Sequence, residues 1–229
     1  MSENDRLDTH AATWSAVDRF FESTLLAHDP ALDAALHDSD AAGLPAINVS
    51  PAQGKFLCQL AKSLGARNIL EVGTLAGYST IWLGRSLPND GHLITLEIDP
   101  KHAAVANANV ARAGLSAKVE LRLGPALETL PQLARENAGP FDFVFIDADK
   151  PNIPTYFDWA VKLARRGAVI VVDNVVRSGE VINVASSDTG VPGVRKLIEG
   201  LSSDPRVEAT AIQTVGAKGY DGFLMAIVK

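Results

Sequence analysis

The chain has 229 residues, 47% hydrophobic and 21% charged, a composition typical of one globular domain with a sizeable core. Its 27 acidic residues exceed its 21 basic ones, and a net charge of -6 gives no basic footprint for nucleic acid. No apolar run approaches the ~20 residues of a membrane span, and the polar N-terminus is unlike a signal peptide. The single cysteine, Cys58, excludes an internal disulfide. We therefore expect a cytoplasmic protein without a membrane partner.

The first part of the chain predicts helices. Apolar residues recur at helical spacing over residues 10–28 and 30–41. A third helix is expected to begin at Ser50, a residue type that caps helix N-termini, with a proline directly after it. Gly65 is expected to end this helix.

From residue 66 onward, short β-rich runs alternate with helical stretches. The expected strands are Asn68–Val72, His92–Glu97, Val119–Leu123, Phe141–Asp147 and Ala168–Asp173. The expected helices are Ser79–Ser86, His102–Ala113, Ala126–Asn137, Ile153–Leu163 and, later, Val194–Leu201. Two further strand-like runs, VEATAIQTV and GFLMAIVK, predict a hairpin joined through Gly216–Tyr220. We expect an α/β fold: a mostly parallel seven-stranded sheet, helices on both faces and an antiparallel C-terminal hairpin.

Acidic side chains gather at the carboxyl ends of the predicted strands. Four of the five strands end in acidic residues, namely Glu71, Glu97, Asp147 with Asp149, and Asp173. Ligands of open α/β sheets bind outside the carboxyl ends of the strands. One such residue would mean little, because aspartate often caps the next helix, but four at one edge indicate a ligand site.

The first strand leads into EVGTLAGYST, where Gly73 and Gly77 permit a tight turn and the close approach of a ligand. Their spacing is G-x-x-x-G rather than G-x-G-x-x-G, which disfavours a pyrophosphate site, and both glycines could instead serve only helix–strand packing. Glu97, about 24 positions after Gly73, can accept hydrogen bonds from two ribose hydroxyls. Together these features favour an adenosine-containing ligand.

A second group offers oxygen donors. If the fourth and fifth strands are neighbours, Asp147 lies about 5 Å from Asp173 and Asn174. Hard oxygen ligands suit Mg²⁺, Mn²⁺ or Ca²⁺, and no Cys/His set suits zinc. The alternative is a turn at Asp173 and Asn174 with Asp147 as a helix cap, and spacing alone does not decide. None of the five histidines matches the site, and we expect them at the surface or at helix caps: His10, His28, His37, His92 and His102.

These motifs resemble the cation-dependent class I O-methyltransferases, the caffeoyl-CoA and catechol O-methyltransferase group, which use S-adenosylmethionine. The matching stretches run in family order from about residue 40 to the end: INVSPAQGKFL, ILEVGTLAGYST, LITLEIDP, LGPALETLP, FDFVFIDADK, VIVVDNVVRSGEV and VEATAIQTVGAKGYDGFLMAIVK. The most specific part is DADK followed later by VVDN. The resemblance implies a Rossmann-like core over residues 66–229, covered on its cofactor and acceptor side by residues 1–65, and a homodimer.

The resemblance also implies roles for single residues. The cofactor-binding positions are Ile47, Val49, Glu71, Gly73, Thr74, Ser79, Glu97, Ala126, Asp147 and Asp149. A divalent cation, with Mg²⁺ preferred over Mn²⁺ or Ca²⁺, would be held by Asp147, Asp173 and Asn174. Lys150 matches the proposed general base, with Asp147 beside it, and the residues expected near a phenolic acceptor are Lys150, Tyr156 and Arg177.

Two departures from the family bear on the acceptor. The family often has D-N-Y after DADK where this chain has Pro151-Asn152-Ile153, and Arg177 stands where plant-type enzymes carry tryptophan. Both disfavour caffeoyl-CoA and leave a small catechol-like or phenylpropanoid acceptor with vicinal hydroxyls. The rival hypotheses are a nicotinamide-dependent oxidoreductase, which the missing G-x-G-x-x-G disfavours, and a non-catalytic adenosine-ligand sensor, which would not need the oxygen donors and Lys150.

Overall fold

The computed structural model describes the backbone of residues 3–229 and the side chains from residue 10 onward. Seven strands form one sheet in the order β3-β2-β1-β4-β5-β7-β6. Their bounds are β1 Asn68–Val72, β2 His92–Glu97, β3 Val119–Leu123, β4 Phe141–Ile146, β5 Ala164–Asp173, β6 Val207–Gly216 and β7 Gly219–Val228. Strands β1 to β5 are parallel, and β7 runs antiparallel to both β5 and β6. The predicted fold class is confirmed, with the reversed strand β7 one place inside the edge strand β6.

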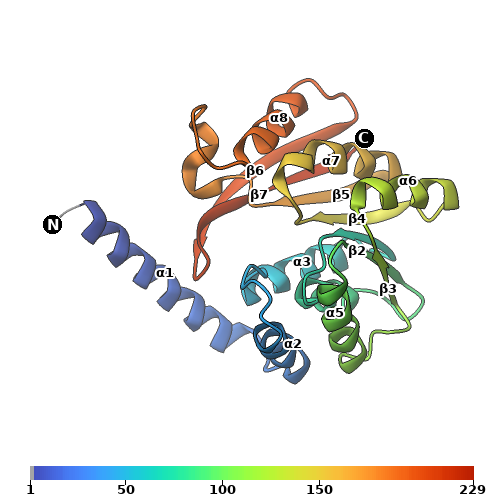
Figure 1. Cartoon of the computed structure of the whole chain (residues 1–229), viewed down its shortest axis with the longest axis horizontal. Coiled ribbons are helices and arrows are strands. Elements are labelled where there is room, and N and C mark those ends of the chain that lie inside the picture. Colours follow the sequence, from blue (N-terminus) through green and yellow to red (C-terminus); the bar gives the residue numbers. More distant parts are fainter. Residues whose placement is uncertain (1–2) are drawn as a thin grey trace.

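Helices lie on both faces of this sheet (Figure 1). Their bounds are α1 Glu3–Leu25, α2 Pro30–Ala41, α3 Pro51–Ser63, α4 Tyr78–Gly84, α5 Pro100–Arg112, α6 Ala126–Glu136, α7 Ile153–Leu163 and α8 Val191–Leu201, with 3₁₀ turns η1 Lys150–Asn152 and η2 Arg177–Ile182. Helices α6, α7 and α8 contribute to one hydrophobic cluster, and α2 to α5 contribute to the other.

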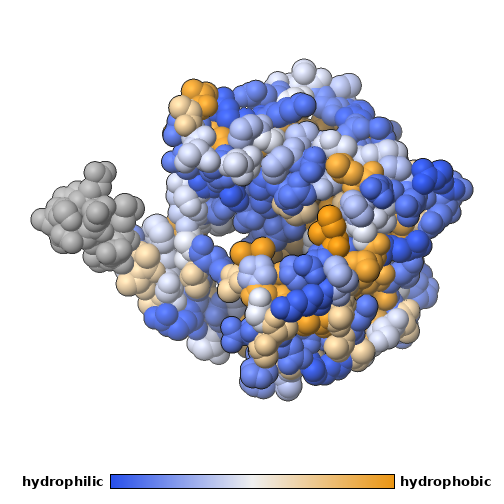
Figure 2. All heavy atoms as spheres, in the orientation of Figure 1, coloured by the Kyte–Doolittle hydropathy of each residue, from blue (hydrophilic) through white to orange (hydrophobic). Residues whose placement is uncertain are grey.

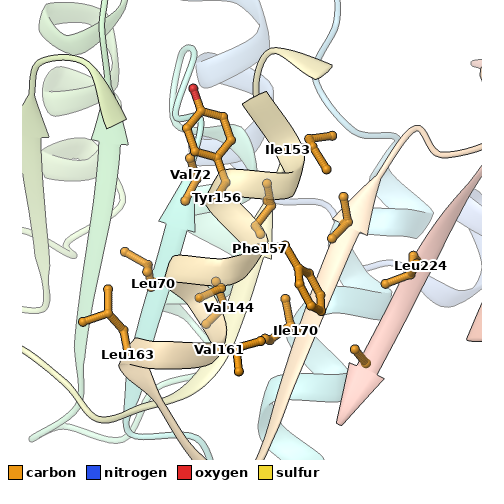
Figure 3. Packing of buried hydrophobic residues seen from close by; sticks show 14 of the residues in the cluster. Leu70, Val72, Val144, Ile153, Tyr156, Phe157, Val161, Leu163, Ile170 and Leu224 are labelled. Carbon is orange, nitrogen blue, oxygen red and sulfur yellow. The ribbon is translucent and has the colours of Figure 1, made fainter. Parts of the chain in front are cut away.

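The alternation of side chains along each strand separates these two clusters. On β1, Leu70 and Val72 pack with α6 to α8, whereas Ile69 packs with the helices of the opposite face. Figure 3 shows part of the first cluster, in which Phe157 and Val161 of α7 lie over the strands. Because each central strand is buried on both sides, its sequence reads as a continuous apolar run rather than an alternating one.

Most element boundaries follow the local signals in the sequence. The Ser50 hydroxyl accepts a hydrogen bond from the Gln53 amide at 3.1 Å at the start of α3, and Gly65 follows its last turn with φ of 61°. The fifth strand begins four residues earlier than predicted, at Ala164, because Ala164 pairs with Phe141 across a register shift. That pairing is a contact between strands, so the sequence of the fifth strand alone does not report it.

The first helix is longer than predicted and projects from the rest of the chain (Figure 1). Four of its large apolar side chains are exposed: Val17, Phe20, Phe21 and Leu25. The Asp18 carboxylate accepts a hydrogen bond from the Ala217 amide, which ties α1 to the turn between β6 and β7. Among the described residues, no helix combines the length and the apolar character that crossing a membrane requires.

Both predicted glycines of the β1–α4 turn have positive φ, 102° at Gly73 and 83° at Gly77. A Cβ at Gly73 would lie 2.0 Å from the main-chain oxygen of Asp147, so the carboxyl ends of β1 and β4 approach more closely than any other residue would allow. A Cβ at Gly77 would lie 3.4 Å from Ala106 of α5, an ordinary packing distance. Gly73 therefore serves a close approach, whereas Gly77 supplies the turn.

We expect Gly73→Ala to lower the free energy of unfolding by more than about 2 kcal/mol, because the methyl group would overlap the Asp147 carbonyl. Gly65→Ala is the matched control: its φ is also positive, but no atom lies within 4 Å of the added Cβ, so only the backbone cost of about 1 kcal/mol applies. Urea unfolding measures both, and equal losses would contradict the steric role of Gly73.

Candidate active site

A cavity of about 690 Å³ opens at the carboxyl ends of the parallel strands, where β1 lies between β2 and β4. The view in Figure 2 shows a hollow near the middle of the molecule, with hydrophobic residues gathered beside it. Most residues predicted for the site line this cavity: Ile47, Val49, Gly73, Thr74, Ser79, Glu97, Ala126, Asp147, Asp149, Lys150, Tyr156, Asn174 and Arg177. The fold thus brings residues from 47 to 177 to one end of the sheet.

Glu71 lies behind the cavity wall rather than on it. Its side chain is fully buried, and its Oε2 accepts hydrogen bonds from the Thr80 and Thr95 hydroxyls. The Thr95 hydroxyl also lies 2.6 Å from that of Thr74, which donates to the Leu96 carbonyl. Among the described residues, the buried Oε1 of Glu71 has no hydrogen-bond partner. Burial raises the pKa of Glu71 from 4.5 to about 7.

Glu97 lies on the wall with its carboxylate held by main-chain amides. Oε2 accepts from the Leu75 amide at 2.8 Å, and Oε1 accepts from the Ile98 and Asp99 amides at 2.9 Å each. A carboxylate oxygen has two lone pairs, so Oε2 keeps one acceptor position for a ligand. The carboxylate is preorganised toward the cavity, where the sequence predicts a ribose.

The expectation that every histidine lies outside the site is wrong for His102. It lines the cavity, and its Nδ1 lies 3.5 Å from Oε1 of Glu97. Its position in the first turn of α5 makes it look like a capping residue in the sequence, and only the approach of α5 to β2 brings it beside Glu97.

Lys150 lies near the carboxylates of Asp147 and Asp173 at the ends of β4 and β5. Lys150 Nζ donates to Oδ1 of Asp147 at 3.0 Å, and only 9% of Lys150 is exposed. Its main chain packs against α8, because a Cβ at Gly193 would lie 2.1 Å from the Lys150 carbonyl oxygen. Asp173 is 5% exposed, and burial, followed by the nearby charge of Asp147, raises its pKa to about 7.

The arrangement at this end fits a hard divalent cation. Asp147 and Asp173 place two carboxylates against one ammonium, which leaves the buried Asp173 without full charge compensation. Asn174 follows with φ of 56° and lines the cavity, adding an amide oxygen to the donor set. Among the described residues, no three His, Cys, Asp or Glu side chains form a metal-holding group, so the candidate set depends on this amide.

The segment after Asn174 is held by Asp221 and Asp188, two residues that the sequence analysis missed. Oδ1 of Asp221 accepts from the Val176 and Arg177 amides at 3.0 Å each. The Arg177 side chain lines the cavity, and its Nε donates to Oδ2 of Asp188 at 2.9 Å. The partners of Asp221 lie more than 40 residues away along the chain, so no local pattern marks this aspartate. Asp188 lies only 11 residues after Arg177, but the sequence does not specify that the two side chains approach.

Two apolar residues of the cavity wall are not among the predicted site residues. Ile98 and Leu127 line the cavity although 67% and 41% of their surfaces are exposed. Ile98 directly follows the predicted end of the second strand, and an apolar residue at such a place is the signal that could have identified it. Leu127 lies in the first turn of α6, where an apolar residue is ordinary and gives no signal. An exposed apolar pair at a cavity mouth suits a flat, weakly polar ligand surface.

Comparison with known proteins decides the family. A sequence profile described as O-methyltransferase matches residues 27–226. The chain belongs to this family. It is a class I S-adenosylmethionine-dependent O-methyltransferase of the caffeoyl-CoA and catechol type, which removes the oxidoreductase and sensor alternatives.

Three relatives show how close the similarity is. A catechol O-methyltransferase of Niastella koreensis is 53% identical over 94% of this chain and 98% of its own length. A catechol O-methyltransferase of Mycobacterium tuberculosis is 55% identical over 93% of this chain and 95% of its own length. The crystal structure of an O-methyltransferase from Bacillus cereus in complex with SAH superimposes with a TM-score of 0.94 at 55% identity, covering 96% of this chain and all of that one.

The O-methyltransferase should show a pH-dependent stability that comes from Glu71. Its folded pKa of about 7 exceeds the 4.5 of the free group, so the folded protein binds more protons between these values and stability falls as pH rises from about 4.5 to 7. We expect Glu71→Gln to remove up to about 3 kcal/mol of this decrease. Urea unfolding of both proteins between pH 4 and 8, with chelator present so that Asp173 contributes equally, measures the difference. Parallel curves would contradict the raised pKa.

Proposed function

We propose that this O-methyltransferase methylates one of two adjacent hydroxyls on a small catechol-like or phenylpropanoid acceptor and depends on a divalent cation. One observation carries the proposal: Asp147, Lys150 and Asn174 line the cavity at the ends of the neighbouring strands β4 and β5, and the buried Asp173 lies near enough to interact with the charges of Asp147 and Lys150. The names of the two catechol O-methyltransferases among its relatives support the same acceptor class.

We assign the cation to Asp147, Asp173 and Asn174, with Mg²⁺ preferred and Mn²⁺ or Ca²⁺ as alternatives. The fit rests on the oxygen donors and on the charge of Asp173, whose burial is only partly compensated. When bound, the cation would act as a Lewis acid that favours the ionised acceptor hydroxyl, and S-adenosylmethionine would supply the methyl group.

We assign the residues of the cavity wall to different parts of the cofactor. Ile47 and Val49 would cover the cofactor, Glu97 would accept from the ribose, Ala126 would lie by the adenine, and Asp149 would face the amino group. The predicted contacts of Gly73 and Thr74 come from the turn after β1, and that of Ser79 comes from the start of α4. The Thr74 hydroxyl is already engaged by Thr95 and Leu96. Glu71 would support this turn from behind.

We assign the acceptor proton to Lys150, which would accept it as the neutral amine after its ammonium has released a proton to solvent. Its Nζ is the basic group beside Asp147, whereas the Arg177 guanidinium is paired with Asp188 and His102 lies beside Glu97. Asp147 contributes by holding Nζ at 3.0 Å, and α8 fixes the Lys150 main chain. A base held in place converts proton removal into a step within the bound complex, which is how orientation lowers a barrier.

Removing the cation or one of its ligands tests the proposal. We expect exhaustive chelation, and Asp173→Asn in saturating Mg²⁺, each to lower turnover of a catechol by at least about a hundredfold, since Lewis-acid stabilisation contributes several kcal/mol. The binding constant for S-adenosylhomocysteine should stay within about threefold in Asp173→Asn, because no predicted cofactor contact involves Asp173. Full turnover after chelation would contradict the metal assignment, and equal loss of cofactor binding would show that the variant is not correctly folded.

We expect the Arg177–Asp188 ion pair to determine whether the enzyme prefers acidic or neutral acceptors. Arg177 lines the cavity beside Asn174, and Asp188 neutralises its guanidinium. An acidic substituent on the acceptor would therefore compete with Asp188 for the forked donors of Arg177.

We expect Arg177→Ala to lower kcat/KM for 3,4-dihydroxybenzoate about three- to tenfold more than for neutral catechol, the size of an exposed ionic hydrogen bond. Asp188→Asn is the matched control and should change the ratio in the opposite direction, because it leaves the guanidinium free. Equal changes for both acceptors would show that Arg177 does not read acceptor charge.

We also propose that a second copy of the chain covers the exposed apolar side chains of α1. Phe20 and Leu25 are 63% and 70% exposed, and β6, to whose hairpin turn α1 is tied, exposes Ile212 and Val215. Two-fold pairing would bury such surfaces on both copies at once. Sedimentation should give a dimer for the native protein and a monomer for Phe20→Asp/Leu25→Asp, and a monomeric native protein would contradict the proposal.

We also propose that the protein is cytoplasmic. Its one cysteine, Cys58, is buried and unpaired, which fits the reducing environment of the cytoplasm.

A further inference from the structure

The Asp149 carboxylate has a separate donor on each of its oxygens. The Tyr156 hydroxyl donates to Oδ1 at 2.5 Å, and the Asn152 amide nitrogen Nδ2 donates to Oδ2 at 2.6 Å. Asp149 itself is exposed and lines the cavity. An exposed aspartate is ordinarily free to rotate, so a carboxylate with a donor on each oxygen is an oriented group.

The two donors come from rigid parts of the fold. Asn152 ends the 3₁₀ turn η1, which packs against α8 through the Lys150 carbonyl. Tyr156 is 4% exposed, and its ring packs in the cluster beneath α7 together with Ile153 and Phe157. Figure 3 shows the Tyr156 ring at the border of this cluster, with its hydroxyl at the end away from the other side chains. The ring is therefore fixed by packing, and only its hydroxyl reaches the site.

The chemistry of Tyr156 suits a hydrogen-bond donor rather than a catalytic acid or base. Burial, together with the neighbouring Asp149 carboxylate, raises the pKa of the phenol above its ordinary value, so the hydroxyl keeps its proton. With one bond accepted at each oxygen, the carboxylate still has acceptor positions for a cationic ligand. The Tyr156 hydroxyl, which the family resemblance assigns to the acceptor, is thus already engaged by Asp149.

We propose that Tyr156 and Asn152 are positioning residues that hold the Asp149 carboxylate toward the ammonium group of S-adenosylmethionine, so that Tyr156 serves the cofactor and not the acceptor. This inference rests on the proposed role of Asp149. Oriented carboxylates gain affinity because the orientation does not have to be established when the ligand binds.

Truncated ligands separate positioning from a merely structural role. S-adenosylhomocysteine carries the ammonium group, whereas 5′-methylthioadenosine keeps the adenosine and sulfur but lacks the amino acid part. Isothermal titration gives the ratio of their binding constants for the native protein, Tyr156→Phe, Asn152→Ala and Asp149→Asn. Tyr220→Phe is the matched control, because it removes a tyrosine hydroxyl that donates to Gln213 on the β6–β7 hairpin.

We expect Tyr156→Phe and Asn152→Ala each to weaken S-adenosylhomocysteine about three- to tenfold, as for the loss of one hydrogen bond to a charged group, and to leave 5′-methylthioadenosine within about twofold. Asp149→Asn should show the same selectivity with a larger loss, and Tyr220→Phe should show none. Tyr156→Phe would overturn the inference if it weakened the binding of both ligands equally or weakened neither. If Asp149→Asn still weakened only S-adenosylhomocysteine, the proposed role of Asp149 would stand. A non-selective Asp149→Asn would overturn that role and the inference with it.

Discussion

The contact between Gly73 and the main chain of Asp147 is the constraint on which the site depends. Without a side chain at Gly73, the carboxyl ends of β1 and β4 lie close together at the point where the order of the strands in the sheet reverses. The turn after β1 then places the Leu75 amide on Glu97, and the turn after β4 presents Asp147, Asp149 and Lys150 to the same cavity. A bulkier residue at position 73 would separate the two halves of the wall.

A second constraint is the shortage of positive charge around buried carboxylates. Asp173 and Glu71 are both almost fully enclosed, and burial raises the pKa of each to about 7. Asp147 has Lys150 as its partner, whereas the carboxylates of Glu97 and Asp149 are satisfied by neutral donors. Neutral donors orient a carboxylate without cancelling its charge, so the carboxylates of Glu97 and Asp149 can still attract cationic groups of a ligand. S-adenosylmethionine carries a sulfonium and an ammonium, and both are cationic groups of this kind.

The reversed strand β7 positions the chain segment that follows β5. Because β7 is reversed between β5 and β6, its Asp221 lies at the carboxyl end of β5 and can bind the amides of Val176 and Arg177. Those bonds hold Arg177 at a φ of 57°, a conformation that costs free energy for a residue with a side chain. The hairpin therefore shapes the cavity wall at Arg177, although no residue of β7 lines the cavity.

The sequence by itself determined the fold class and the limits of β1, β2, β3 and α7, because these depend on periodicity, caps and strand ends that are local in the chain. Its resemblance to a known family implied many of the residues that line the cavity. The sequence also carried the family, through the DADK and VVDN motifs and their order. Only the tertiary structure decided which polar groups are already engaged. Tyr156 bonds Asp149, Arg177 bonds Asp188, Glu71 lies behind the wall and His102 lies beside Glu97. The physical reason is that a hydrogen bond depends on distances of about 3 Å between groups, and neither composition nor spacing along the chain specifies such a distance across elements.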